Sequence, residues 1–126
     1  MADSRRSDRL ARQLHAELAA VLEAEVDDPG IADVVVTGVR VSKDLRHARV
    51  FVHSPAGSAK SDELVRRLES ARGFLRHQLS IRLAHLRRTP ELSFTYDHSV
   101  EAGLRIEQLL ADFPKPEDTG TSDREE

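Results

Sequence analysis

The sequence predicts a single α+β domain, because stretches with helical and strand-like patterns of apolar residues alternate along its 126 residues. Two long stretches repeat leucine at helical spacing, and three short stretches are rich in β-branched residues or alternate apolar with polar side chains. The predicted order is helix, strand, strand, helix, bend, helix, strand and a last helix. A chain of this length can bury one hydrophobic core of modest size.

The first half of the chain predicts a helix followed by a β-hairpin. The helix is expected over residues 5–25, and the turn sequence DDPG at residues 27–30 ends it. Strands are expected at residues 34–41 and 47–54, with a bulge at Gly38. The short connection between them predicts antiparallel pairing. The apolar positions of the helix are Leu10, Leu14, Leu18, Val21 and Leu22.

A second helical pattern begins near Asp62 and predicts a bent helix. If this helix were straight, Arg82 would lie on its apolar stripe, so a bend or a change of phase is expected. Gly73 falls on the opposite, polar side. The apolar stripe consists of Leu64, Leu68, Ala71, Leu75 and Leu79, widened on one side by Phe74 and Ile81.

The end of the chain predicts one more strand and one more helix. The strand follows Pro90, and Ser99 is expected to cap a helix that runs to Phe113. Residues 114–126 are polar and acidic and are expected to form a disordered tail, which leaves residues 1–113 as a single domain. One face of the last strand carries Leu92, Phe94 and Tyr96.

Charge is distributed unevenly, although the net charge is only −3. Residues 1–39 carry four basic and eight acidic side chains, residues 40–88 carry twelve and four, and residues 89–126 carry three and ten. Residues 66–88 alone hold seven arginines and one glutamate. Such a basic centre indicates either a localised anion-binding surface or solvated charge without a partner.

The sequence contains no recognisable catalytic or cofactor motif. It has no cysteine, no Walker loop, no GxGxxG and no zinc-like histidine pair, so we expect no metal, no nucleotide cofactor and no enzymatic activity. The run Asp97-His98-Ser99 fits turn and cap chemistry better than a triad, whose members meet through the fold. No apolar run approaches the roughly 20 residues that span a bilayer, and the N-terminus is polar, so we expect a cytoplasmic protein.

Gly73 is unusual because glycine inside a helix costs about 1 kcal/mol relative to alanine. One interpretation is a bend or a close helix contact. The other is close approach of a phosphate to a backbone without a side chain, between Arg72 and Arg76.

Several motifs together resemble those of one known family. They are DDPGI, VTGVRVSKDLRHARVFV, ARGFLRHQL and TPELSFTYDHSVEAGLRI. In this order and at these distances they are similar to bacterial ribosome-binding factor A, from about Arg9 to Leu110. The resemblance implies a type II KH-like fold, with a three-stranded sheet and helices on one face. In that family a kinked helix pair with an Ala-x-Gly element replaces the GxxG turn of other KH domains, and here the element is Ala71, Arg72 and Gly73.

The resemblance also implies a function. Such proteins bind the free 30S subunit and assist late maturation of 16S rRNA, including processing of its 5′ region, by binding rather than by catalysis. They are linked to growth in the cold, and an assembly GTPase can release them. We expect a monomer with no membrane contact.

The expected rRNA contacts are mostly arginines, which neutralise phosphates. The main alternative is a general module for single-stranded nucleic acid that uses the sheet face of Arg40, Arg49, Phe51 and His53. A protein adaptor and a hydrolase using His98 are further alternatives. The expected contacts are Arg66, Arg72, Gly73, Arg76, His77, Arg87 and Arg88, Lys43 and Arg46 on the hairpin connection, and Arg5, Arg6, Arg9 and Arg12 near the N-terminus.

Overall fold

The structure is a computed structural model that describes residues 2–31, 33–100 and 103. Its elements follow the predicted order as far as the third strand. The predicted helix from Ser99 to Phe113 extends outside the described residues, and the predicted tail at 114–126 lies entirely outside them. The elements are α1 (Ala2–Ala24), η1 (Pro29–Ile31), β1 (Val35–Val41), β2 (His47–His53), η2 (Ser58–Lys60), α2 (Ser61–Ser70), α3 (Arg72–Arg82) and β3 (Glu91–Tyr96).

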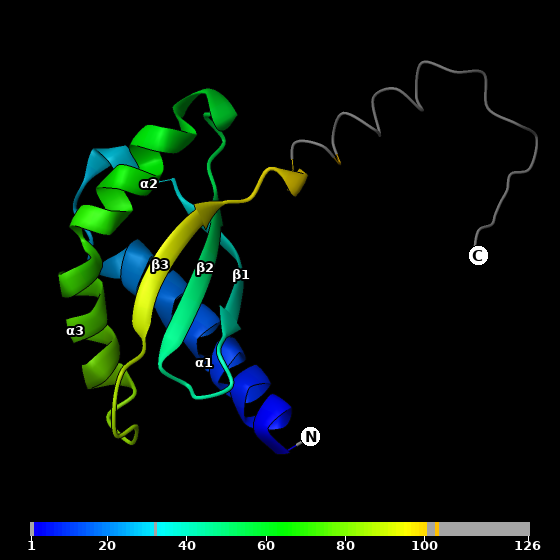
Figure 1. Ribbon diagram of the computed structural model, residues 1–126. Helices are drawn as coiled ribbons and strands as arrows, with labels where there is room; N and C mark the ends of the chain where they lie inside the picture. The colour runs from blue at the N-terminus through cyan, green and yellow to red at the C-terminus, as the bar shows by residue number, and fades with distance from the viewer. Residues whose placement is uncertain (1, 32, 101–102, 104–126) are drawn as a thin grey trace, which may run out of the picture.

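The three strands form a mixed sheet in the order β1-β2-β3, with the helices packed on one face (Figure 1). Strands β1 and β2 are antiparallel, as the short connection predicted. The register shifts between Val36 and Gly38, which confirms the predicted bulge. Strands β2 and β3 are parallel, so the chain must cross from one end of the sheet to the other, and α2 and α3 make this crossover.

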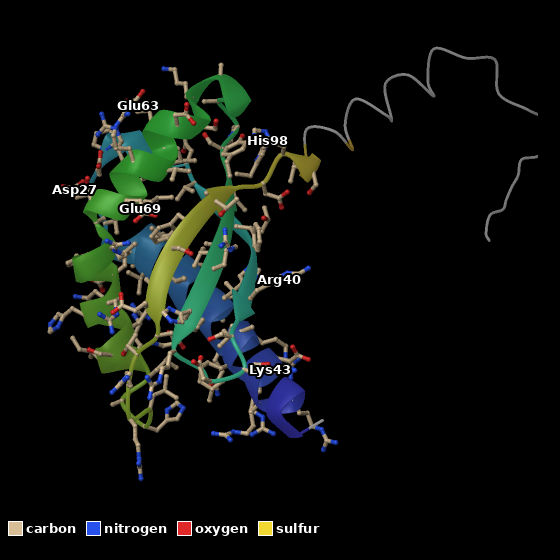
Figure 2. The ribbon with its side chains drawn as sticks, viewed as in Figure 1. Asp27, Arg40, Lys43, Glu63, Glu69 and His98 are labelled. Atoms are coloured by element: carbon tan, nitrogen blue, oxygen red, sulfur yellow. The ribbon has the colours of Figure 1, made fainter. Side chains whose placement is uncertain are left out.

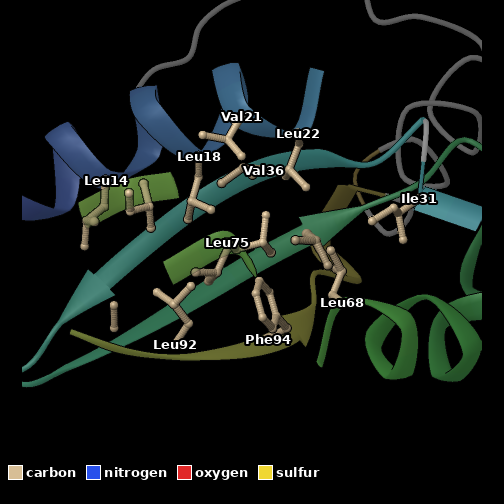
Figure 3. Packing of buried hydrophobic residues seen from close by; sticks show 14 of the residues in the cluster. Leu14, Leu18, Val21, Leu22, Ile31, Val36, Leu68, Leu75, Leu92 and Phe94 are labelled. Carbon is tan, nitrogen blue, oxygen red and sulfur yellow. The ribbon is translucent and has the colours of Figure 1, made fainter. Parts of the chain in front are cut away.

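The core lies between the sheet and the helices α1, α2 and α3 (Figure 3). All five apolar positions predicted for the first helix are buried, and so are alternate residues of β2 and β3. The ring of His15 is 2.9 Å from the carbonyl oxygen of Val36, which adds a polar contact between α1 and β1. The opposite sheet face carries exposed or half-buried side chains, as the alternation in β2 predicted.

The bend between α2 and α3 is centred on Ala71, where φ is −89° and ψ is 3°. The Ala71 N–H is 3.1 Å from the carbonyl oxygens of both Arg67 and Leu68, a shared bond typical of a helix end. Gly73 is the second residue of α3 and is exposed. An added Cβ there would meet nothing within 4 Å, so neither the bend nor close packing requires the glycine.

The prediction that Phe74 and Ile81 widen the apolar stripe is wrong. Their side chains are 44% and 58% exposed. Helix α3 packs against α1 and β3 through the narrow row of Leu75, Leu79 and, just after the helix, Leu83. Residues at this four-residue spacing share one face of a helix, and residues about 100° away from them lie outside the contact.

Arg82 ends α3 and does not interrupt the core. Its guanidinium group lies 3.3 Å from a carboxylate oxygen of Glu17 and 3.6 Å from one of Glu25, both on the α1 side. Arg82 therefore pairs with a mid-helix acid, Glu17, and with Glu25 just after the C-terminal end of α1, where negative charge opposes the helix dipole.

We predict that Leu75→Ala lowers the free energy of unfolding by about 2–5 kcal/mol, because it opens a cavity in the core. Phe74→Ala, one residue away, should change it by less than about 1 kcal/mol, because the side chain is already 44% exposed and lies outside the core. Urea unfolding of both variants tests this. Equal losses would mean that Phe74 belongs to the core.

Candidate nucleic-acid interface

The parallel register of β2 and β3 brings two loops side by side. His47, the first residue of β2, lies opposite Glu91, the first residue of β3, and the Glu91 N–H donates to the Arg46 carbonyl oxygen at 2.8 Å. The loops that precede the two strands, residues 42–46 and 83–90, must therefore share one end of the sheet. The N-terminal end of α1 lies at the same end of the molecule (Figure 1).

A groove of about 670 Å³ opens between these three segments. Its apolar lining consists of Leu10, Leu45 and Leu86, one from each segment. Four arginines and a histidine surround these leucines, with a single carboxylate, Asp44. Figure 2 shows nitrogen-bearing side chains gathered at this end, where Lys43 lies. The basic residues that line the groove are Arg6, Arg46, His85, Arg87 and Arg88.

The loop at 42–46 is held by its own side chains. The Asp44 carboxylate accepts hydrogen bonds from the Ser42 hydroxyl at 2.6 Å and the Arg46 N–H at 3.0 Å, and these lower the pKa of Asp44. Ser42 in turn accepts from the His47 N–H at 3.1 Å. Leu45 has a φ of 62°, a left-handed conformation that costs a non-glycine residue about 1–2 kcal/mol.

The arginines of the basic centre differ in whether they form ion pairs. Four of them form ion pairs inside the fold: Arg72 lies 2.8 Å from Glu69, Arg82 binds α1, and the other two are Arg67 and Arg76. By contrast, in the described part of the chain none of the arginines that line the groove forms an ion pair. Their charge is therefore available to an anionic partner.

Arg76, one of the expected phosphate contacts, is bonded inside the fold. Its Nη2 donates to the Thr89 carbonyl oxygen at 2.7 Å and its Nε to that of Pro90 at 3.1 Å, while Nη1 lies 3.5 Å from the Glu91 carboxylate. The guanidinium group thus anchors the segment that leads into β3. The structure places Arg76 as a support of the loop that carries Arg87 and Arg88.

The remaining expected contacts do not line the groove. Arg66, Arg72, Gly73 and His77 are exposed on α2 and α3 but do not line the groove. The structure therefore separates the bend from the basic groove. His85, Leu45 and Leu86 line the groove and were absent from the expected contacts, because only the pairing of distant loops brings them there. The other exposed basic residues from the expected set are Arg5, Arg9, Arg12 and Lys43.

The DDPG motif has a structural role. The Asp28 carboxylate accepts from the Gly30 N–H at 2.8 Å and lies 3.2 Å from the Arg67 guanidinium group, which also pairs with Glu63 at 3.2 Å. A Cβ added at Gly30 would overlap the Arg67 side chain. Any other residue at position 30 would require the Arg67 side chain to move from this position, in which it links η1 to α2.

Asp97, His98 and Ser99 form a turn and do not make a catalytic relay. The Asp97 carboxylate accepts from the Ser99 hydroxyl at 2.5 Å, the Ser99 N–H at 2.9 Å and the Thr37 hydroxyl at 2.6 Å. The hydrogen bond from the Ser99 hydroxyl, followed by that from Thr37, lowers the pKa of Asp97. The carboxylate of Asp97, two residues before, therefore accepts the backbone N–H at the start of this helical segment, and the hydroxyl of Ser99, which was expected to cap it, donates to that carboxylate instead.

The open sheet face offers a weaker site than the groove. Arg49 donates to the Thr95 hydroxyl at 3.0 Å, and Phe51 is half-buried beside Gly38. A hollow of about 320 Å³ is lined by Arg40 and Asp97, so a positive and a negative side chain lie in the same hollow. This face therefore has less unopposed positive charge than the groove.

Two other kinds of site are absent among the residues that the structure describes. No helix there is long and apolar enough to cross a membrane. No group of histidine, aspartate and glutamate side chains in the same residues is arranged to hold a metal ion.

Comparison with known proteins assigns the chain to a family. A model of the family described as "Ribosome-binding factor A" matches residues 6–110. The chain belongs to the ribosome-binding factor A family. It is 47% identical over 106 residues to ribosome-binding factor A from Methylobacillus flagellatus, an alignment that covers 83% of this chain and 82% of that protein.

Solved structures of ribosome-binding factor A share the fold. The crystal structure from Thermus thermophilus matches with a TM-score of 0.64 at 29% identity, over 71% of this chain and 93% of that chain. A homology model of the T. thermophilus factor, fitted into a cryo-EM map of a 30S complex, matches with a TM-score of 0.57 at 28% identity, over 70% and 91%. The KH-like fold that the sequence motifs implied is confirmed.

We predict that Arg76→Ala lowers the free energy of unfolding by about 1–2 kcal/mol, because it leaves two carbonyl groups without their charged donor. Arg66→Ala removes the same charge from an exposed position and should change stability by no more than about 0.5 kcal/mol. Thermal and urea unfolding provide the measurement. If both variants were as stable as the parent protein, the anchoring role of Arg76 would be wrong.

Proposed function

We propose that this protein binds the free 30S subunit through 16S rRNA and assists late maturation of that rRNA, including processing of its 5′ region, without catalysing a reaction. Membership of the ribosome-binding factor A family supports this proposal. So does the likeness to the T. thermophilus factor that was fitted into a map of a 30S complex. In the same proposal the protein is a cytoplasmic monomer, acts during growth in the cold, and is released by an assembly GTPase.

The observation that carries the proposal is the groove, whose four arginines form no ion pair with any residue that the structure describes. Guanidinium groups bind phosphate through paired N–H donors and remain charged at all physiological pH values. Arginines that already bind carboxylates inside a fold contribute less to such a surface. Arg6, Arg46, Arg87 and Arg88 therefore supply the main phosphate contacts, while Arg5, Arg9, Arg12 and Lys43 extend the positive field around them.

The bend contributes a second contact in this proposal. Gly73 is exposed, and the space where a Cβ would lie is open. RNA backbone can therefore approach the start of α3 closely, with Arg66 and His77 on the neighbouring helical surface. Arg72 lies beside it but is paired with Glu69, so its contribution is smaller. Within the described part of the chain, no side chain caps the first turn of α3. Backbone N–H groups at the junction already donate to carbonyl oxygens of α2, so the positive charge at this contact comes from the side chains.

Binding acts here by stabilising one conformation of the rRNA. A protein that binds one of two rRNA conformations more tightly shifts the population towards it, by as much as the difference in affinity allows. Residues 1–113 form the binding domain in this proposal, and the acidic residues 114–126 form a tail that takes no part in phosphate contact.

The double variant Arg87→Glu with Arg88→Glu should weaken binding to free 30S subunits and leave thermal stability unchanged. The loss of two phosphate contacts should reduce the slope of log affinity against log salt concentration by about 1.4, at about 0.7 per contact for single-stranded RNA. Sedimentation with purified subunits over a range of salt concentrations measures both effects.

Arg40→Glu with Arg49→Glu is the matched control, because it makes the same change of charge on the open sheet face. We expect its affinity and salt slope to remain close to those of the parent protein. A larger loss in this control than in the groove variant would support the general nucleic-acid module that uses the sheet. Equal losses would show that net charge matters and the groove does not.

Gly73→Ala should weaken 30S binding while the unfolding temperature stays the same or rises. Alanine favours the helix by up to about 1 kcal/mol relative to glycine. The new methyl group meets no protein atom within 4 Å, so a loss of binding must come from contact with the partner. Unchanged binding would show that RNA does not approach the backbone at Gly73.

A further inference from the structure

We propose that the groove holds an unpaired nucleotide of the RNA, with its base against the three leucines and its flanking phosphates on the surrounding arginines. This inference rests on the proposed function and adds what the groove recognises. The volume of about 670 Å³ falls within the range of about 300–1,000 Å³ that is usual for small-molecule sites. Its lining combines an apolar surface with cationic side chains, as a nucleotide requires.

The apolar part of the groove comes from three distant segments. Leu10 lies on α1, Leu45 on the loop before β2 and Leu86 on the loop before β3. Leu10 is almost fully buried, whereas Leu45 and Leu86 are half-buried and pack against the core. Leu45 and Leu86 therefore leave part of their apolar surface accessible in the groove. A site for phosphate alone has no need of such a surface.

The conformation of Leu45 is a second, independent observation. Its φ of 62° lies in the left-handed region, where glycine or asparagine is usual. The chain keeps a large apolar side chain at this strained position, next to Arg46 and within the groove. Strained residues persist where the surrounding structure fixes them, and they are frequent at ligand sites.

The positive charge around the groove favours RNA over a protein partner. Four arginines face one carboxylate, and Asp44 already accepts two hydrogen bonds from its own loop. Bases are accessible to apolar side chains only where RNA is unpaired, because the A-form helix hides them. The occupant is therefore a single-stranded segment, a bulge or a loop.

The test compares two RNAs that carry the same number of phosphates. The full chain is titrated at low salt with a fluorescently labelled oligouridine and with a matched oligonucleotide whose bases are absent. A base stacked on an aromatic ring gains about 1–3 kcal/mol, and leucine contacts are expected to reach only the lower end of this range, so the oligouridine should bind about 5-fold more tightly. Equal affinity for the two RNAs, or no binding of either, would overturn the proposal.

Variants then locate the base. Leu45→Gly relieves the left-handed strain and removes the apolar side chain, so it should abolish the preference for the RNA with bases and leave affinity for the abasic RNA unchanged. Leu86→Asn gives the same test if Leu45→Gly proves unstable. Phe51→Ala and Phe74→Ala remove the partly exposed aromatic rings elsewhere, and both should retain the preference. Loss of the preference in either, with its retention in the leucine variants, would place the base outside the groove.

Two measurements on the parent protein, its binding to 30S subunits and its binding to the two RNAs, separate this inference from the proposed function. If the parent protein binds 30S subunits but treats the two RNAs alike, the function stands and the base site is wrong. If the protein does not bind 30S subunits at all, the proposed function itself fails.

Discussion

The parallel pairing of β2 with β3 is the constraint on which the rest of the molecule depends. Parallel neighbours cannot be joined by a short turn, so α2 and α3 must carry the chain back across the sheet. The same register sets Glu91 opposite His47, and this brings the two loops that precede these strands together. An antiparallel third strand would have placed Arg87 and Arg88 at the other end of the sheet, far from Arg46.

Arginine therefore serves two purposes in one small domain. Arg67, Arg76 and Arg82 are fixed by acids or backbone carbonyl groups and hold η1, the segment before β3 and α1 in place. The arginines of the groove have no such partner among the described residues. The paired arginines reduce the stability of the fold little, because a nearby carboxylate neutralises the charge of each one. The groove arginines remain available to phosphate and give the groove its positive field.

Local pattern was sufficient to predict the elements but not the site. Leucine spacing located the helices, and alternation in β2 correctly assigned its buried face, because both signals depend only on neighbours along the chain. The exposure of Phe74 was missed because α3 meets the core only through the narrow row of Leu75, Leu79 and Leu83, so a residue about 100° away on the helix lies outside the contact. The anchoring of Arg76 was missed because its acceptors, 13 and 14 residues away, become neighbours only through the tertiary fold. The groove could not be predicted without the strand register, because only the pairing of β2 with β3 brings its loops together.

Photo-crosslinking from single positions to the 30S subunit tests the central claim most directly. A benzoylphenylalanine placed at His85, an exposed position in the groove, should crosslink to 16S rRNA. The same group at Arg40, on the open sheet face, should give little or no crosslink. Crosslinking to rRNA from Arg40 and not from His85 would contradict the assignment of the groove as the RNA-binding surface.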